Sequence, residues 1–548
     1  MVYTSKQTTC QRYVLKIRSK RLRQEGWDMT LPLSEARRND EVIALADSQM
    51  LRWIDELNDV VDVDERAMAV RSEIRRTRRN GSGGSAVSKR HRLRELYDEL
   101  DGLEFKPDYL CLIIDRKKDY HRACKGFSIN GVRYRRLLGT NGGIKNSTIV
   151  FVSERLHDEL ERRINNGRDM GKELVTAKLE AYRALACSAS IPVSLPKGIL
   201  VVDDAETSFV SDVLYVSDDC DGEPIMEERK GEAITLDASD GFGLMLPSLA
   251  ERWGAELGLD YIPSGCNTRF SFEKGMVFTF DFLEFAESVA GSYVVKDAWG
   301  RDVDVREVEL ILTTSMVKLW DSYDSCEDYL TKSLSNNYTF GVTKACPACL
   351  ESERCTNYQF LQSFELTDSD IDELVRPTMD EVRDVLGGDW RKTVLFLKGG
   401  WLTEDNVAGI TDDFAKAIMV DRRMLGDPFA RSEIYSAIRK RIDDAKVGVL
   451  KVHGNYSIVS GDPYLLCQSI FGLEKTGLLG AGEIYNEYWA DCGPERLICF
   501  RAPMTCHENI RSVKPVDNEG TRHWYRYMRT CTIFNGWDTA AMALNGMD

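Results

Sequence analysis

Several features that mark common protein classes are scarce or missing in this chain of 548 residues. It has six histidines, and the two nearest, His507 and His523, stand sixteen positions apart, which argues against a histidine-rich metal site. No stretch approaches the roughly 18 consecutive apolar residues of a membrane-spanning helix. The basic N-terminus is not followed by the apolar core of a secretory signal. We therefore expect a cytoplasmic protein with no membrane partner.

Common catalytic signatures are also absent. The sequence has no Walker A phosphate loop, no Gly-x-Ser-x-Gly nucleophile turn and no His-Glu-x-x-His zinc motif. The chemistries of P-loop NTPases, α/β-hydrolases and zinc proteases therefore have no sequence support here.

The fifteen cysteines are an odd number, and most of them stand singly among apolar residues. This usage favours reduced, buried thiols over a disulfide framework. One group is closer together: Cys346 and Cys349 form a C-x-x-C pair, and Cys355 follows six residues later. A structural zinc site needs four ligands, and only three can be named here. Two interpretations stay open, namely zinc held by these cysteines, or three reduced cysteines near the start of a helix.

Charge is unevenly distributed along the chain. Lys and Arg number 72 against 88 Asp and Glu, a net charge of −16. Residues 1–150 contain 30 basic and 21 acidic residues (net +9), which leaves 42 and 67 (net −25) for the rest. The acidic total argues against a histone-like nucleic-acid coat but leaves room for an enzyme with a local basic channel. The basic region 71–145 is either a nucleic-acid contact or a solvated surface.

Hydrophobic periodicity alternates between helical and strand-like along the chain. Ile434, Ile438 and Ile442 recur at four-residue spacing, as on one helix face, whereas Met276 and Phe278 alternate with their neighbours as in a half-buried strand. Such β-rich blocks interrupted by helices predict an α+β fold with two separate β modules, not a doubly wound sheet. We predict five regions: helical 1–105, mixed α/β 106–234, β-rich 235–345, a helical connector 346–445 and β-rich 446–548.

Two local segments have clear signals. Asn80–Ser85 has the composition of a flexible linker and separates two basic clusters within Arg71–Arg94. We predict that this arm is mobile and contacts nucleic acid without sequence preference. Ile129-Asn-Gly-Val132 predicts a hairpin with a type I′ turn.

Two lysines stand beside predicted strands of the same β module. Lys274 precedes a glycine at the start of one strand, and Lys318 follows another. Each lysine alone is more often a surface charge than a functional group. Together they could converge on one anion.

Read in chain order, a series of short motifs resembles the two-barrel (double-psi β-barrel) RNA polymerase superfamily. It includes RNA-interference-type RNA-dependent RNA polymerases and single-chain relatives from phages and mobile elements, and the match looks closest to the latter. The motifs are Asn130–Thr140, Asn166–Asp169, Ala177–Tyr182, Ser188–Pro192, Asp240–Gly243, Glu273–Met276, Ser315–Lys318, Asn357–Gln362 and Arg501–Arg511.

Two places near the C-terminus qualify this resemblance. Glu508-Asn509 stands where the superfamily usually has Gly-Asp. Leu544–Asp548 resembles the start of the metal-binding signature Asp-x-Asp-Gly-Asp, with Asp548 as its first aspartate. We therefore expect the second barrel to be cut at Asp548. The chain alone would then be catalytically incomplete, and a C-terminal segment or a partner chain would complete it.

The resemblance implies double-psi β-barrels within 235–345 and from 446 onward, linked by helical segments. It implies template-directed RNA synthesis with a nucleic-acid template, nucleoside triphosphates and Mg²⁺. Lys274 and Lys318 would contact phosphate, Asp548 would bind Mg²⁺, and the nucleic acid would lie against Arg133, Arg135, Arg136, Lys145, Arg501 and Arg511. The alternatives are a non-catalytic nucleic-acid-binding protein that uses residues 71–145, and a zinc-bearing structural protein.

Overall fold

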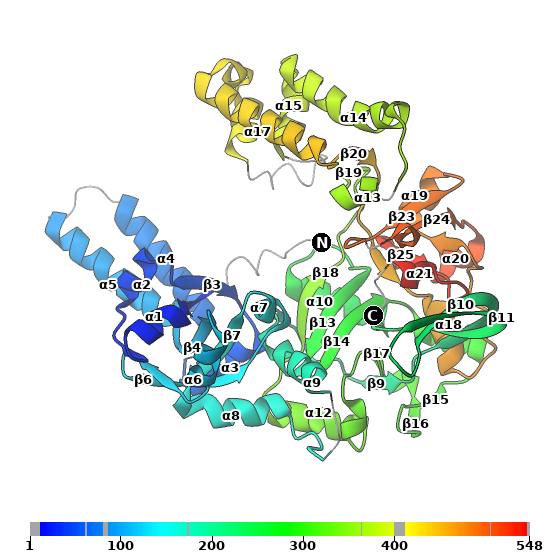
Figure 1. Cartoon of the computed structure of the whole chain (residues 1–548), viewed down its shortest axis with the longest axis horizontal. Helices are drawn as coiled ribbons and strands as arrows, with labels where there is room; N and C mark the ends of the chain where they lie inside the picture. Colours follow the sequence, from blue (N-terminus) through cyan, green and yellow to red (C-terminus); the bar gives the residue numbers. More distant parts are fainter. Residues whose placement is uncertain are drawn as a thin grey trace. The chain divides into compact units, whose positions relative to one another are not determined.

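The computed structural model describes residues 11–60, 63–79, 86–171, 175–362, 364–398, 412–504 and 506–544. The chain divides into two compact units (Figure 1). The first comprises Met1–Asp204, Gly241–Cys346 and Cys467–Leu473, and the second comprises Ala205–Asp240, Pro347–Leu466 and Glu474–Asp548. In the described part of the chain, no helix combines the length and apolarity that crossing a membrane requires.

The N-terminal part of the first unit is a seven-stranded mixed sheet with the order β2-β5-β6-β7-β4-β1-β3. Its strands are β1 (Gln11–Arg18), β2 (Asp28–Met29), β3 (Val42–Ala46), β4 (Phe105–Ile113), β5 (Phe127–Ile129), β6 (Val132–Leu138) and β7 (Thr148–Ser153). Strand β1 runs parallel to β4 and antiparallel to β3. The helical prediction for residues 1–105 missed these first strands, because β1 and β2 pair with β4 and β5, which lie much later in the chain.

The hairpin prediction for residues 129–132 is confirmed. Strands β5 and β6 pair antiparallel, with Ile129 opposite Val132. Asn130 and Gly131 between them have φ angles of 52° and 78°, and a type I′ turn requires positive φ at both positions.

Two long helices, α4 (Val63–Arg79) and α5 (Ala86–Glu104), pack against each other as a helical hairpin (Figure 1). The predicted linker Asn80–Ser85 lies outside the described residues. The other helices of this part are α1 (Ser19–Gln24), α2 (Leu33–Arg38), α3 (Gln49–Leu57), α6 (Lys117–Ala123), α7 (Asn141–Lys145), α8 (Glu154–Asn165) and α9 (Thr176–Arg183).

A second seven-stranded sheet of the first unit has the order β8-β18-β13-β14-β12-β17-β9. Its strands are β8 (Ile191–Pro192), β9 (Ile199–Val202), β12 (Phe242–Met245), β13 (Gly265–Phe270), β14 (Glu273–Thr279), β17 (Leu310–Thr313) and β18 (Gly341–Ala345). The accompanying helices are α10 (Pro247–Leu257), α11 (Phe282–Phe285) and α12 (Cys326–Ser335), and β15 (Val294–Lys296) pairs with β16 (Asp302–Asp304). One hydrophobic core joins both sheets, with Trp53, Val150, Trp253 and Val277 buried in it.

The second unit contains a five-stranded sheet with the order β21-β25-β22-β24-β23. The strands are β21 (Ile458–Ser460), β22 (Glu483–Tyr485), β23 (Leu497–Phe500), β24 (Ile510–Pro515) and β25 (Cys531–Phe534), and the helices between and after them are α18 (Pro463–Ile470), α19 (Glu487–Cys492), α20 (Glu519–Trp524) and α21 (Ala540–Ala543). A long ribbon, β10 (Glu206–Asp218) with β11 (Pro224–Asp237), belongs to the same unit.

The predicted helical connector forms a group of helices around a small core of its own in the second unit. Its elements are α13 (Tyr358–Gln362), α14 (Asp368–Leu386), α15 (Trp390–Lys398), α16 (Asp413–Val420) and α17 (Pro428–Lys446), flanked by the paired strands β19 (Glu353–Cys355) and β20 (Lys451–His453). The α+β class is therefore confirmed. The double-psi connectivity of the two β modules stays a prediction, and so does the cut at Asp548, because residues 545–548 lie outside the described part.

Candidate functional site

The two lysine-bearing segments lie side by side in the first unit. Lys274 is the second residue of β14, and Lys318 lies in the turn that follows β17. The amide of Lys274 donates to the carbonyl of Met316 (3.0 Å), and the amide of Lys318 donates to the carbonyl of Phe272 (3.1 Å). These hydrogen bonds place the two backbone segments next to each other. Whether both side chains reach one phosphodiester unit stays a prediction.

A third cation, Arg269, belongs to the same cluster. Strands β13 and β14 pair antiparallel with Arg269 directly opposite Lys274. Burial lowers the pKa of Lys274 from its usual value, and the positive charges of Arg269 and Lys318 lower it further. The three cations therefore repel one another, and an anion bound among them would relieve that repulsion. Sequence reasoning missed Arg269, because only the strand register brings it to Lys274.

A buried carboxylate, Glu273, precedes Lys274 in the chain and interacts electrostatically with Arg269 and Lys318. Its side chain is fully buried, and Thr268 Oγ1 donates to its Oε1 (2.8 Å). Among the described residues, no hydrogen-bond partner reaches its Oε2. Burial raises the pKa of Glu273 to about 7, although Arg269, Thr268 and Lys318 act in the opposite direction. Near neutral pH this group is only partly ionised, so the cations around it are only partly neutralised.

Two glycines allow the strands of this site to approach closely. A Cβ on Gly275 would lie 2.6 Å from the carbonyl oxygen of Gly241 and 2.7 Å from Met316 Cε. A Cβ on Gly243 would lie 2.2 Å from the carbonyl oxygen of Ile311. Because contacts below 3.0 Å do not occur for real Cβ atoms, only glycine fits at either position. The glycines of these motifs therefore serve the packing of β12 against β14 and β17.

An aspartate holds the turn that leads to Lys318. Asp204 accepts hydrogen bonds from Thr314 Oγ1 (2.8 Å), from the amide of Ser315 (2.8 Å) and from Ser315 Oγ (2.6 Å). Ser315 Oγ also accepts a hydrogen bond from the amide of Gly241 (2.9 Å). These bonds tie the turn after β17 to the Asp240–Gly243 motif. Sequence reasoning did not single out Asp204, and no local pattern marks it.

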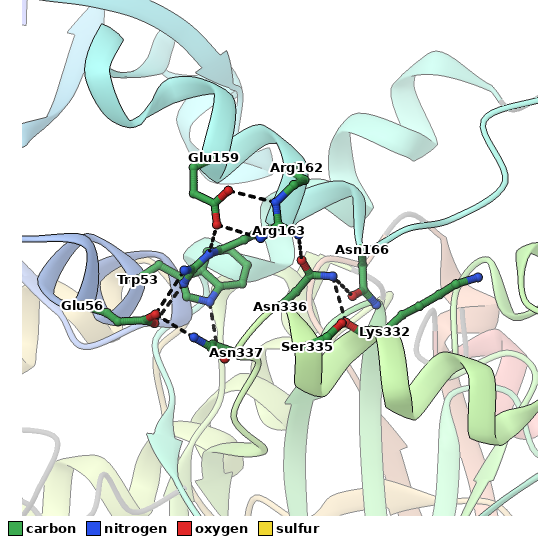
Figure 2. Close-up of polar contacts among 10 residues, drawn as sticks. All are labelled: Trp53, Glu56, Glu159, Arg162, Arg163, Asn166, Lys332, Ser335, Asn336 and Asn337. Atoms are coloured by element: carbon green, nitrogen blue, oxygen red, sulfur yellow. Dashed lines mark hydrogen bonds and ion pairs between the residues drawn. The ribbon is translucent and has the colours of Figure 1, made fainter.

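Asn166, the first residue of the motif Asn166–Asp169, is hydrogen-bonded to the turn that precedes Lys274. It is fully buried, and its Nδ2 donates to Ser271 Oγ (2.7 Å) in the turn between β13 and β14. Its Oδ1 accepts from Asn336 Nδ2 (3.0 Å), as Figure 2 shows. In the same figure Arg162 donates to Asn336, and Arg163 pairs with carboxylates on α3 and α8. This network connects α3, α8 and α12 to the turn that precedes Lys274.

The predicted nucleic-acid contacts on β6 have partners within the protein. Arg133, Arg135 and Arg136 each form an ion pair with a carboxylate, from Glu154, Asp158 and Glu180 respectively. Lys145 is exposed at the end of α7. Contacts of these four residues with nucleic acid stay predictions. The three arginines would have to give up ion pairs to make them.

Arg501 and Arg511 come together in the second unit. Strands β23 and β24 pair antiparallel, with Phe500 opposite Ile510, which brings the two arginines to one end of this strand pair. Nearby, Asn509 Nδ2 donates to the carbonyl of Ala543 at the end of α21 (2.6 Å). Asp548, the predicted Mg²⁺ ligand, lies outside the described residues, and its place stays a prediction.

The zinc interpretation finds no support. In the described part of the chain, no group of three or more His, Cys, Asp or Glu side chains is arranged to hold a metal ion. Cys346 is buried in the first unit, whereas Cys349 and Cys355 belong to the second unit and are exposed and half-buried. Cys355 Sγ accepts a hydrogen bond from Arg441 Nη1 (2.9 Å). None of the three forms a disulfide within the described residues, and both interpretations of this cysteine group stay predictions.

Comparisons with known proteins point to one family. The model of the family described as "RNA dependent RNA polymerase" matches residues 95–540. The DNA-directed RNA polymerase YonO of Bacillus phage SPbeta is 28% identical over 391 residues, which are 67% of this chain and 43% of that protein. The RNA dependent RNA polymerase QDE-1 from Thielavia terrestris has a similar fold, with a TM-score of 0.51 and 14% identity over 80% of this chain and 48% of that chain. The chain thus spans less than half the length of each relative.

Proposed function

Because this chain belongs to the RNA dependent RNA polymerase family, we propose that it synthesises RNA from nucleoside triphosphates on a nucleic-acid template. The observation that carries the proposal is the backbone pairing of the Lys274 and Lys318 segments within one sheet. The family match includes both segments, since it extends over residues 95–540. The relatives differ in their titles, one being DNA-directed and the other RNA dependent. Both titles name an RNA polymerase, so RNA is the product that the two relatives share. An experiment has to decide whether the template is DNA or RNA.

The cation cluster suits nucleotidyl transfer. Negative charge grows on the phosphoryl oxygens during transfer, and positioned cations stabilise it most when they need no rearrangement. Lys274 and Arg269 stand opposite each other on paired strands, and the Asp204 hydrogen bonds hold the turn that carries Lys318. We assign Lys274 and Lys318 to phosphate contact. The negative charge of a bound triphosphate would oppose the lowering of the Lys274 pKa.

The proposal includes Mg²⁺ but names only one residue that would bind it. Mg²⁺, when bound, would supply positive charge that stabilises the negative charge of the displacement. Asp548 would be one of its ligands, as the resemblance to the Asp-x-Asp-Gly-Asp signature implies. The described residues contain no carboxylate group arranged for a metal, so no step of the mechanism is assigned to particular metal ligands.

The proposal is tested by primed RNA synthesis with Mg²⁺ and nucleoside triphosphates on DNA and on RNA templates. The purified chain is assayed both alone and together with the segment or partner chain that would complete the second barrel. Lys274→Ala and Lys318→Ala should each lower synthesis on the order of 10²- to 10³-fold, the usual cost of removing one charge-stabilising group. Template binding should change much less. Lys296→Ala is the matched control, because this exposed lysine pairs with Asp302 in the same unit.

Two outcomes would contradict the proposal. Template binding without synthesis on either template, by the completed protein as well as by the chain alone, would support the alternative of a non-catalytic nucleic-acid-binding protein. Equal losses of synthesis and of template binding in the lysine variants would reduce Lys274 and Lys318 to plain electrostatic contacts.

A further inference from the structure

The α4–α5 hairpin carries a cationic surface that the proposed synthesis site does not use. The two helices meet along an apolar seam, in which Val70 and Ile74 of α4 and Leu96 of α5 are buried. The whole of α4 precedes the residues that the family model matches, which begin at residue 95. Membership of the family therefore assigns no role to this helix.

Four side chains of α4, namely Ser72, Arg75, Arg76 and Arg79, line a shallow hollow on the surface of the first unit. We call this surface the α4 arginine face. All four residues are exposed. Because successive helix residues are about 100° apart, they lie on the side of α4 opposite the seam residues Val70 and Ile74.

The arginines of this face differ from their neighbours in how they are paired. Arg71 forms an ion pair with Glu104, and Arg92 forms one with Glu73. In contrast, no carboxylate of the described residues lies within ion-pair distance of the three arginines of the face, and Arg75 makes only a 3.4 Å hydrogen bond to Ser72 Oγ. Three neighbouring cations without a counter-charge repel one another, so this arrangement is suited to an external anion.

A purely structural explanation covers only part of this pattern. Cations near the C-terminus of a helix interact favourably with its dipole, and Arg76, Arg78 and Arg79 lie in the last turn of α4. The dipole acts equally on all sides of the helix. It therefore does not explain why three cations share the outward side, nor why Arg75 joins them from outside the last turn.

We propose that the α4 arginine face binds the phosphate backbone of nucleic acid without reading its sequence. Guanidinium groups match phosphate oxygens in geometry and stay charged at all physiological pH values. Residues 1–150 carry a net charge of +9 and the rest of the chain −25, so a polyanion is attracted to this part of the chain and repelled by the remainder. A protein partner is disfavoured, because the lining of the hollow offers no apolar anchor of the kind that dominates protein interfaces.

The test measures binding in the absence of nucleotides, so its outcome does not depend on the proposed synthesis. Fluorescence anisotropy of a labelled duplex, of a shuffled duplex and of one of its single strands is followed from low to high salt. In the face variant, Arg75→Ala with Arg76→Ala and Arg79→Ala, the slope of log affinity against log salt on duplex DNA should become shallower by about 0.9 for each phosphate that is no longer neutralised, or roughly 2 to 3 in all. At 0.1 M salt its affinity should fall at least about tenfold. The two duplexes should lose affinity equally.

Two further variants and one modified duplex show whether the effect is specific to the α4 arginine face and to phosphate charge. Arg18→Ala with Arg92→Ala and Arg306→Ala removes the same charge from exposed arginines that are already paired, and it should leave the slope nearly unchanged. Replacing the three face arginines with lysine should restore most of the slope, because the charge returns. A duplex with uncharged methylphosphonate linkages should bind the wild type and the face variant alike.

Clear results would overturn the proposal. If the face variant and the paired-arginine variant lose the same affinity, only the net charge of the chain matters. If the face variant keeps the wild-type slope, the face makes no phosphate contact. If its loss differs between the two duplexes, the face reads bases. Circular dichroism should show unchanged helix content in every variant, because the replaced side chains are exposed.

Discussion

The lysine-bearing sheet and the α4–α5 hairpin both gather cations, but they hold them in different ways. In the sheet, Lys274 and Arg269 stand opposite each other on paired strands, and Glu273, next to Lys274 in the chain, is buried. In the hairpin, the cations of the α4 arginine face stand on the exposed side of a helix. Rigid, partly desolvated cations suit the stabilisation of charge during a reaction. Exposed cations are screened by salt, and they suit the attraction of a polyanion whatever its sequence.

The largest stability effect expected from this contrast comes from the close approach of strands in the sheet. Gly243→Ala would place a Cβ 2.2 Å from the backbone oxygen of Ile311, where no flexible side chain can give way. We expect the free energy of unfolding to fall by about 3 kcal/mol or more, at the upper end of overpacking effects. Urea denaturation followed by circular dichroism measures it. An unchanged midpoint would show that β12 and β17 are more loosely packed than described.

The second prediction concerns the buried carboxylate. The pKa of Glu273 in the folded protein is about 7, above its ordinary value of about 4.3. Between these values the folded state keeps a proton that the unfolded state has lost, so the free energy of unfolding should fall as the pH rises from about 4.3 to about 7. The decrease is at most about 3.7 kcal/mol at 1.36 kcal/mol per pKa unit.

Glu273→Gln should abolish this part of the pH dependence and should be more stable than the wild type above pH 7. Denaturation curves of both proteins at a series of pH values provide the measurement, with the difference between the two proteins as the readout. Parallel curves across the whole range would mean that Glu273 titrates normally and is reached by solvent.

The smallest expected change in the free energy of unfolding concerns the α4–α5 hairpin, and it is a gain in stability. Gly102 lies near the end of α5, and no atom comes within 4 Å of a Cβ added there. Gly102→Ala should raise the free energy of unfolding by about 0.5–1 kcal/mol, because alanine loses less conformational freedom in a helix than glycine. Measuring Gly102→Ala and Gly243→Ala by the same denaturation assay separates the effect of helix propensity on stability from the effect of strand packing. A loss of stability would reveal a contact of α5 that its exposure does not suggest.

Local patterns made several features predictable. The Asn130-Gly131 turn was readable because its two residues tolerate positive φ. The alternation of side chains around Phe278, typical of a half-buried strand, predicted a strand, and β14 occupies that position. Strands β1 and β2 were missed, since they owe their place to partners far along the chain, and β3 in turn pairs with β1. Arg269 and Asp204 were missed for the same reason, because neither stands in a recognisable local pattern.

The amino-acid sequence alone specifies which chemical groups this protein can bring together: the order of its polymerase-like motifs, the two lysines beside strands, and the basic character of its first 150 residues. Which cations are partnered and which are not depends on the folded arrangement. Arg133, Arg135 and Arg136 form ion pairs, whereas the α4 arginine face has none in the described residues. The folded arrangement also decided that Glu273 is buried beside Arg269. Register and burial depend on residues that are distant in sequence, and they set the charge and pKa of a group as much as its identity does.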